Sequence, residues 1–258
     1  MKKSNLLLVV FLAFTINLFS QNGYKAEYKI LLEKNGFSPM HYSLIGDESQ
    51  SEFKFIERVA PERVVADEFS GQVFLNPETP DSIQPFIFTN RKLNKIYSTD
   101  FITEDDGLSY TMYNIIEPIT VKWEFESEVK KIDGFLCKKA TTTFRGRNYI
   151  AWYSDEIPVS LGPWKFHGLP GLVVNITDSK NEVSFILEKI KMPYNHSIGN
   201  SMQIDTLNNI PVEDFIELRK NAKLKSREFF EKKLLSKLPR GANIELVEEG
   251  NNDIEIEM

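Results

Sequence analysis

The sequence predicts a mainly β protein: a curved antiparallel sheet, or a partly open barrel shaped like a bowl, with a C-terminal helical segment packed on it. Short apolar runs with a period of two recur up to residue 192. Glycine, proline, asparagine and aspartate separate these runs, as they do in the turns of an antiparallel meander. Beyond residue 211 the apolar residues recur at helical spacing. Because no linker interrupts the pattern, we expect a single domain over residues 21–258.

Residues 1–20 are expected to be a secretory signal peptide that is removed. Lys2 and Lys3 precede an apolar run from Leu6 to Phe14, and the small residue Ser20 suits the cleavage position. The apolar run is too short to span a bilayer. We therefore expect an exported protein with no transmembrane segment after cleavage, located in the periplasm or outside the cell.

The first group of expected strands lies before residue 100. The run Tyr24–Leu32 alternates in polarity, which places Tyr24, Ala26, Tyr28 and Ile30 on one side. The other expected strands of this group are Met40–Ile45, Phe53–Ile56, Gln72–Leu75, Pro85–Phe88 and Leu93–Tyr97. Residues 58–70 fit neither a strand nor a helix and are interpreted as a loop.

A second group of strands is expected between residues 119 and 192. Its members are Ile119–Val129, Leu136–Phe144, Asn148–Tyr153, Leu172–Ile176 and Val183–Ile190. In the first of these, Val121, Trp123 and Phe125 share one face. The run Leu172–Ile176 is almost continuously apolar, which is typical of a central strand covered on both faces.

The C-terminal region is expected to form a helix between residues 211 and 238. Pro211 suits a first helical turn, and Glu213 and Asp214 suit a helix N-terminus. The basic residues of this stretch are interpreted as a solvated helix face, and the formal net charge of −6 disfavours nucleic acid as a partner.

One hexapeptide is the most specific feature of the chain. It consists of Gly168, Leu169, Pro170, Gly171, Leu172 and Val173. Two glycines and a proline constrain the backbone but carry no reactive group, so the hexapeptide is interpreted as a structural element. In the preceding Trp164–His167, alternation predicts that one pair, Trp164 with Phe166 or Lys165 with His167, points inward and the other pair outward. Ligand or partner contacts are assigned to Trp152, Trp164, Lys165 and His167.

No catalytic or metal-binding constellation is found in the sequence. Cys137 is the one cysteine, so no intrachain disulfide forms, and it is interpreted as a small buried residue. His41, His167 and His196 are too far apart in sequence to suggest a metal site. We expect no cofactor and no enzymatic activity. Two short stretches resemble bacterial O-glycosylation sites, Asp81-Ser82-Ile83 and Asp205-Thr206-Leu207.

The order of several short residue groups resembles a known family. The residues are Trp123, Gly134-Phe135, Cys137, Lys139-Ala140, Gly146-Arg147, Tyr149, Ala151-Trp152, Ile157-Pro158, Gly162-Pro163, Phe166 and the hexapeptide. Over residues 119–192 the chain resembles the GLPGLI family of Bacteroidota, with Val173 where isoleucine is usual. It is also similar to the N-terminal bowl-like domain of type II peptide:N-glycanases, which is not catalytic.

The resemblance implies an exported protein of unestablished activity, often encoded beside an outer-membrane transporter of the TonB-dependent kind. Three functions are considered. The first is a non-catalytic binding or accessory protein of the cell envelope, which holds a ligand or partner on an open concave face. The second is a carrier of a hydrophobic, acyl-chain ligand in the same concavity. The third is a hydrolase assembled from scattered acidic groups and His167.

Overall fold

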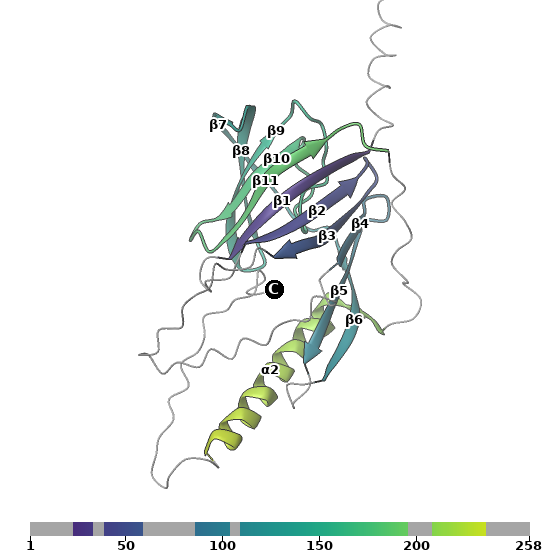
Figure 1. Cartoon of the computed structure of the whole chain (residues 1–258), viewed down its shortest axis with the longest axis vertical. Helices are drawn as coiled ribbons and strands as arrows, with labels where there is room; N and C mark the ends of the chain where they lie inside the picture. Colours follow the sequence, from purple (N-terminus) through teal and green to yellow (C-terminus); the bar gives the residue numbers. More distant parts are fainter. Residues whose placement is uncertain (1–22, 33–38, 59–85, 104–108, 196–207, 236–258) are drawn as a thin grey trace, which may run out of the picture.

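The fold class predicted from the sequence is confirmed: one large curved sheet accompanies a C-terminal helix (Figure 1). The computed structural model describes residues 23–32, 39–58, 86–103, 109–195 and 208–235. Within these ranges, twelve strands form a sheet in the order β12-β6-β5-β4-β3-β2-β1-β11-β10-β9-β8-β7. Neighbouring strands are antiparallel, apart from the parallel pair β12 and β6.

The elements have the following bounds. The first six strands are β1 (Tyr24–Leu32), β2 (Met40–Gly46), β3 (Gln50–Arg58), β4 (Phe86–Asn90), β5 (Lys95–Thr103) and β6 (Tyr110–Pro118). The next six are β7 (Glu124–Ile132), β8 (Phe135–Phe144), β9 (Arg147–Ser154), β10 (Leu172–Asp178), β11 (Val183–Lys191) and β12 (Asn208–Pro211). The helix is α2 (Val212–Leu235).

One face of the sheet carries the core, and we call it the inner face. In β1 the alternation predicted from the sequence is confirmed, since Tyr24, Ala26, Tyr28 and Ile30 are buried while the residues between them are half-exposed. Strand register extends this face across half of the sheet. Directly paired residues form one row, which consists of Tyr24, Gly46, Ser51, Thr89, Ile96 and Glu117.

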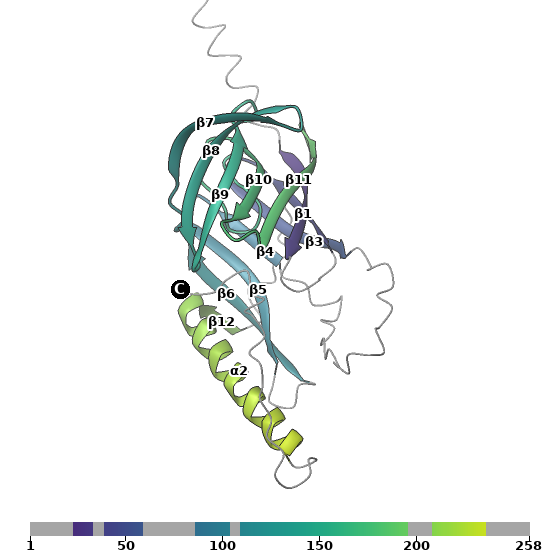
Figure 2. The same ribbon diagram turned by 90° about the vertical axis from the view of Figure 1, so that its left-hand side faces the viewer.

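The sheet curls until its two halves meet across the inner face. β6 and β8 lie near opposite ends of the strand order. Nevertheless, Arg145, in the turn between β8 and β9, forms an ion pair with Glu117 of β6. The inner face is therefore concave, and Figure 2 shows strands β7 to β9 arching over it.

Residues 155–171, which connect β9 and β10 and which we call the inner loop, fill this concavity. Tyr24 donates a hydrogen bond to the carbonyl of Leu161 at 2.9 Å. The fully buried ring of Phe166 contacts Tyr149 of β9 and Phe185 of β11, with ring centroids 4.7 and 5.4 Å apart. The expectation of an open concave face is therefore wrong in this part of the sheet, because the protein's own loop occupies the space.

The helix covers the inner face at the β12–β6–β5 edge only. Val212 and Phe215 are buried against Ile115 of β6 and neighbouring apolar side chains. Pro211 is the last residue of β12, so the prediction that it opens the helix is wrong: parallel pairing with β6 extends the strand to this residue. Among the described residues, no helix combines the length and apolar character needed to cross a membrane.

Several strand boundaries differ from those predicted. β7 begins at Glu124 instead of Ile119, and Phe125 is exposed whereas Val121 and Trp123 pack on the core. An irregularity of the ladder between Phe125 and Val129 accounts for the broken alternation. In addition, Leu93 lies exposed in the turn before β5, and strands β6 and β12 were not predicted.

Strand β7 is an edge strand of unusual exposure. Its residues from Glu124 to Lys131 are all exposed, on both faces of the sheet. Among the strands that the structure describes, it has β8 as its one neighbour.

Some predictions concern residues outside the described ranges and stay predictions. They are the signal peptide over 1–20, the strand Gln72–Leu75, the loop beyond Arg58, the two glycosylation sites and His196.

The glycines of the hexapeptide are expected to differ in what they contribute to stability. A Cβ on Gly171 would lie 2.1 Å from the carbonyl oxygen of Ser154, which is backbone and cannot yield. Gly168 has φ of +95° but no close neighbour. Gly171→Ala is therefore expected to lower the free energy of unfolding by about 3 kcal/mol or more. Gly168→Ala is expected to lower it by about 1–2 kcal/mol, through backbone strain alone. Denaturant unfolding measures both values.

The matched control is Gly134→Ala in the turn between β7 and β8. Gly134 has φ of +93° and nothing within 4 Å of a Cβ, so it reproduces the backbone strain of the Gly168 variant without the inner loop. Equal decreases in the free energy of unfolding for Gly134→Ala and Gly171→Ala would contradict the close approach of the backbone at Gly171 to that at Ser154.

Candidate functional site

Three of the four residues assigned from the sequence to ligand contact lie in the inner loop, and the fourth, Trp152, lies on β9. The structure buries Trp164, Lys165 and His167 inside the concavity, and it buries Trp152 on β9. The prediction that one of the two alternating pairs points outward is wrong, since Lys165 and His167 are 5% and 3% exposed and Trp164 and Phe166 are buried as well. Their contact with a ligand or partner stays a prediction.

Lys165 and Arg145 share a buried counterion. The ammonium group of Lys165 lies 2.5 Å from one carboxylate oxygen of Glu117, close enough for an ion pair although the hydrogen-bond geometry is poor. Arg145 pairs with the other oxygen. The three side chains are almost excluded from water, with 1% of the Glu117 side chain exposed. The carboxylate therefore links β6, the β8–β9 turn and the inner loop.

His167 is held as a neutral imidazole beside this cluster. Its Nε2 lies 2.9 Å from the hydroxyl of Thr89, two strands from Glu117 in the same cross-strand row. Burial, with the positive charge of Arg91 nearby, lowers the pKa of His167 to about 3. The backbone carbonyl of His167 accepts a hydrogen bond of 2.9 Å from the indole of Trp123. The residue is thus fixed from both sides.

Two further residues named in the sequence analysis are also engaged. Cys137 is fully buried, and burial raises the pKa of its thiol, which suits an inert packing residue better than a nucleophile. The ammonium of Lys130 lies 3.7 Å from the ring centroid of Trp152. Over the ranges that the structure describes, no group of three or more His, Cys, Asp or Glu side chains is placed to hold a metal ion.

Sequence reasoning missed Glu117 and Arg145. A strand over Tyr110–Pro118 would have placed Ile115 and Glu117 on one face, and a carboxylate beside a core residue indicates a buried partner. This pattern could be recognised in the sequence. The partners of Glu117 could not, because the curl of the sheet brings Arg145 and Lys165 to this carboxylate from distant segments.

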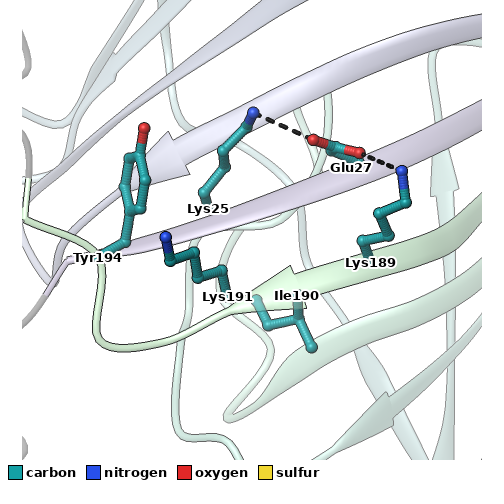
Figure 3. A pocket seen from close by; sticks show the side chains of 6 residues that line it. All are labelled: Lys25, Glu27, Lys189, Ile190, Lys191 and Tyr194. Atoms are coloured by element: carbon teal, nitrogen blue, oxygen red, sulfur yellow. Dashed lines mark ion pairs between the residues drawn. The ribbon is translucent and has the colours of Figure 1, made fainter.

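An open depression lies on the outer face, the side of the sheet opposite the inner loop. Its volume is about 620 Å³, and it is lined by Lys25, Glu27, Lys189, Ile190, Lys191 and Tyr194 (Figure 3). Glu27 of β1 pairs with Lys25 at 3.0 Å and with Lys189 of β11 at 3.2 Å. Hydrogen bonds from these two lysines lower the pKa of Glu27. Unlike the inner cluster, these groups are accessible to solute molecules.

Fold and site together define a curved-sheet protein with a sealed interior beside the inner loop and an open cationic depression outside. Residues 142–175, which include the whole inner loop, match the model of a family described as a protein of unknown function (Porph_ging). The GLPGLI resemblance stays a prediction. A search of curated proteins found no match.

The chain is similar in fold to solved structures. PNGF-II matches 78% of this chain with a TM-score of 0.51 and 14% identity. An uncharacterized conserved protein from Thermus thermophilus matches 77% of this chain and 98% of its own length, with a TM-score of 0.39 and 8% identity. The matched part covers 34% of the PNGF-II chain, so this likeness concerns the fold of about a third of that protein.

Removal of the shared counterion is expected to be strongly destabilising. Glu117→Gln leaves Arg145 and Lys165 as buried cations without a carboxylate. We therefore expect the free energy of unfolding to fall by about 3–5 kcal/mol, measured by denaturant titration. The matched control is Asp155→Asn, which removes the carboxylate of a solvent-exposed ion pair with Lys138 and should remain close to the wild type. Similar losses in the two variants would contradict the buried network.

The neutral state of His167 predicts a pH dependence of stability. Between pH 6.5 and 3 the unfolded chain binds a proton at His167 that the folded chain does not, so stability decreases as the pH falls. From pH 6.5 to 5 this residue should contribute a loss of about 1.4 kcal/mol per pH unit at most. His167→Gln should remove that contribution. The measurement is the difference between the two slopes, which cancels carboxylate titration, and identical slopes would contradict the assignment.

Proposed function

We propose that this chain is an exported, non-catalytic binding or accessory protein of the cell envelope, which acts beside an outer-membrane transporter. The signal-peptide pattern of residues 1–20 supports export to the periplasm or the cell exterior. The resemblance of residues 119–192 to the GLPGLI family supports the transporter as a partner.

The observation that carries the proposal is the engagement of the potentially reactive side chains of the inner loop and of β8. His167, Lys165 and Cys137 are buried, and each contacts protein groups of its own chain. Catalysis needs groups that a substrate can reach, whereas these groups stabilise the curled sheet. Among the described residues, an accessible depression lies on the outer face, and we assign binding to it.

The two alternatives each need the inner loop to move. A carrier of an acyl chain would require the aromatic side chains of the loop to leave the concavity, where Phe166 contacts Tyr149 and Trp164 stacks on Phe185. A hydrolase would require water and substrate to reach His167, which is 3% exposed. No observation in the described part of the chain favours such an opening.

The proposal is tested with the full-length chain, tagged at its C-terminus, in the bacterium that encodes it. We expect the mature form in the envelope fraction, with a mass that shows loss of residues 1–20, and capture of an outer-membrane transporter after crosslinking. Lys189→Glu reverses a charge of the outer depression and should reduce capture several-fold. Lys180→Glu, in the exposed turn between β10 and β11, is the matched control and should not reduce it.

Retention of the full-length chain in the cytoplasm would contradict export. Equal capture by the two variants would contradict binding through the outer depression. A folded His167→Gln variant that still captures the partner, but no longer replaces the wild-type protein in the cell, would favour the hydrolase over a binding protein.

A further inference from the structure

The outer depression contains a repulsive pair of cations. Lys25 of β1 and Lys191 of β11 are direct cross-strand partners on the same face of the sheet. Like charges in this arrangement destabilise a sheet, which makes the pair a local conflict between sequence and structure. Such conflicts are typical of functional sites.

One carboxylate does not neutralise the depression. Glu27 lies between Lys25 and Lys189 and accepts hydrogen bonds from both (Figure 3). Lys191 forms no ion pair with any residue that the structure describes; its described contact is with the ring of Tyr194, 5.6 Å from the ammonium group. Three lysines therefore face one glutamate in a chain whose formal net charge is −6. An anion placed between Lys25 and Lys191 would remove their repulsion.

Tyr194 adds a flat aromatic surface beside these charges. The backbone N–H of Tyr194 donates a hydrogen bond of 2.7 Å to the carbonyl of Gly23, which ties the segment after β11 to the start of β1. The ring of Tyr194 lines the depression on the side of Lys191 (Figure 3). An aromatic ring of this kind binds the C–H face of a sugar ring, while lysines bind a carboxylate.

We infer that the outer depression binds an acidic saccharide, a sugar of the uronate class. Its carboxylate lies between Lys25 and Lys191, and its ring packs on Tyr194. The volume of about 620 Å³ is within the range of small-molecule sites and exceeds what one inorganic anion needs. Four of the six lining residues carry a charge, which disfavours an acyl chain. The inference names the ligand class of the surface assigned above and rests on the proposed function.

The test is calorimetric titration of the mature chain, residues 21–258, with three probes. They are a glucuronate disaccharide, the methyl ester of the same disaccharide, and inorganic phosphate. The ester keeps the ring without the charge, and phosphate keeps a charge without the ring. We expect the glucuronate form to bind at least tenfold more tightly than either control, with an affinity that decreases as salt is raised.

Variants locate the site. Lys191→Gln should weaken glucuronate binding about tenfold, the effect of losing one charge-assisted contact. Lys180→Gln is the control for removing a surface lysine and should bind as the wild type does. Tyr194→Leu should weaken the glucuronate form while leaving the weak binding of phosphate unchanged. Unchanged unfolding curves establish that each variant is folded.

Four results would overturn the inference: no binding of the glucuronate form, equal binding of the ester, equal binding of phosphate, or an unchanged affinity in folded Lys191→Gln. Each is separable from the proposed function. Transporter capture that depends on Lys189, together with no saccharide binding, would retain the accessory role and reject the ligand class.

Discussion

The architecture depends on one segment that ties distant parts of the sheet together through its backbone. The inner loop presents the carbonyl of Leu161 to Tyr24 and the carbonyl of His167 to Trp123, and Tyr28 donates to Val173 where the loop enters β10. Two of the donors come from β1, and the third comes from the segment before β7. Because buried carbonyls require partners, these hydrogen bonds and the conformation of the loop depend on one another. The hexapeptide spans the end of the loop and the start of β10, and at Gly171 its backbone approaches β9 too closely for a side chain.

Buried ion pairs also hold the curled sheet together. In this curled but open sheet, Glu117 of β6 forms ion pairs with Arg145 of the β8–β9 turn and with Lys165 of the inner loop. In a low-dielectric interior each of these groups is tolerated because the others are present. The two polar regions of the molecule differ in how their charges are balanced. In the inner cluster the charged groups form ion pairs with one another, whereas the outer depression has more lysines than carboxylates, in contact with solvent.

Local pattern was sufficient to predict much of the fold and little of the site. The strands at Tyr24–Ile30 and Leu172–Ile176 were predicted correctly, because the burial of a strand requires a pattern of apolar residues that is visible within a few neighbouring positions. The burial of both alternating pairs in Trp164–His167 was not predicted, because a loop inside a curled sheet has protein on both of its sides. The depression was not predicted at all: Lys25 and Lys191 are far apart in sequence, and each alone resembles an ordinary surface lysine.

The exposed edge strand β7 has a consequence for the behaviour of the protein in solution. An unpaired strand edge can recruit the edge of another molecule and start the growth of an intermolecular sheet. In β7 three glutamates are followed by two lysines, Glu124, Glu126, Glu128, Lys130 and Lys131, and all five are exposed. Docking a second backbone against them would strip water from these ions. Among the described residues, the charges of β7 therefore oppose the growth of an intermolecular sheet from this edge.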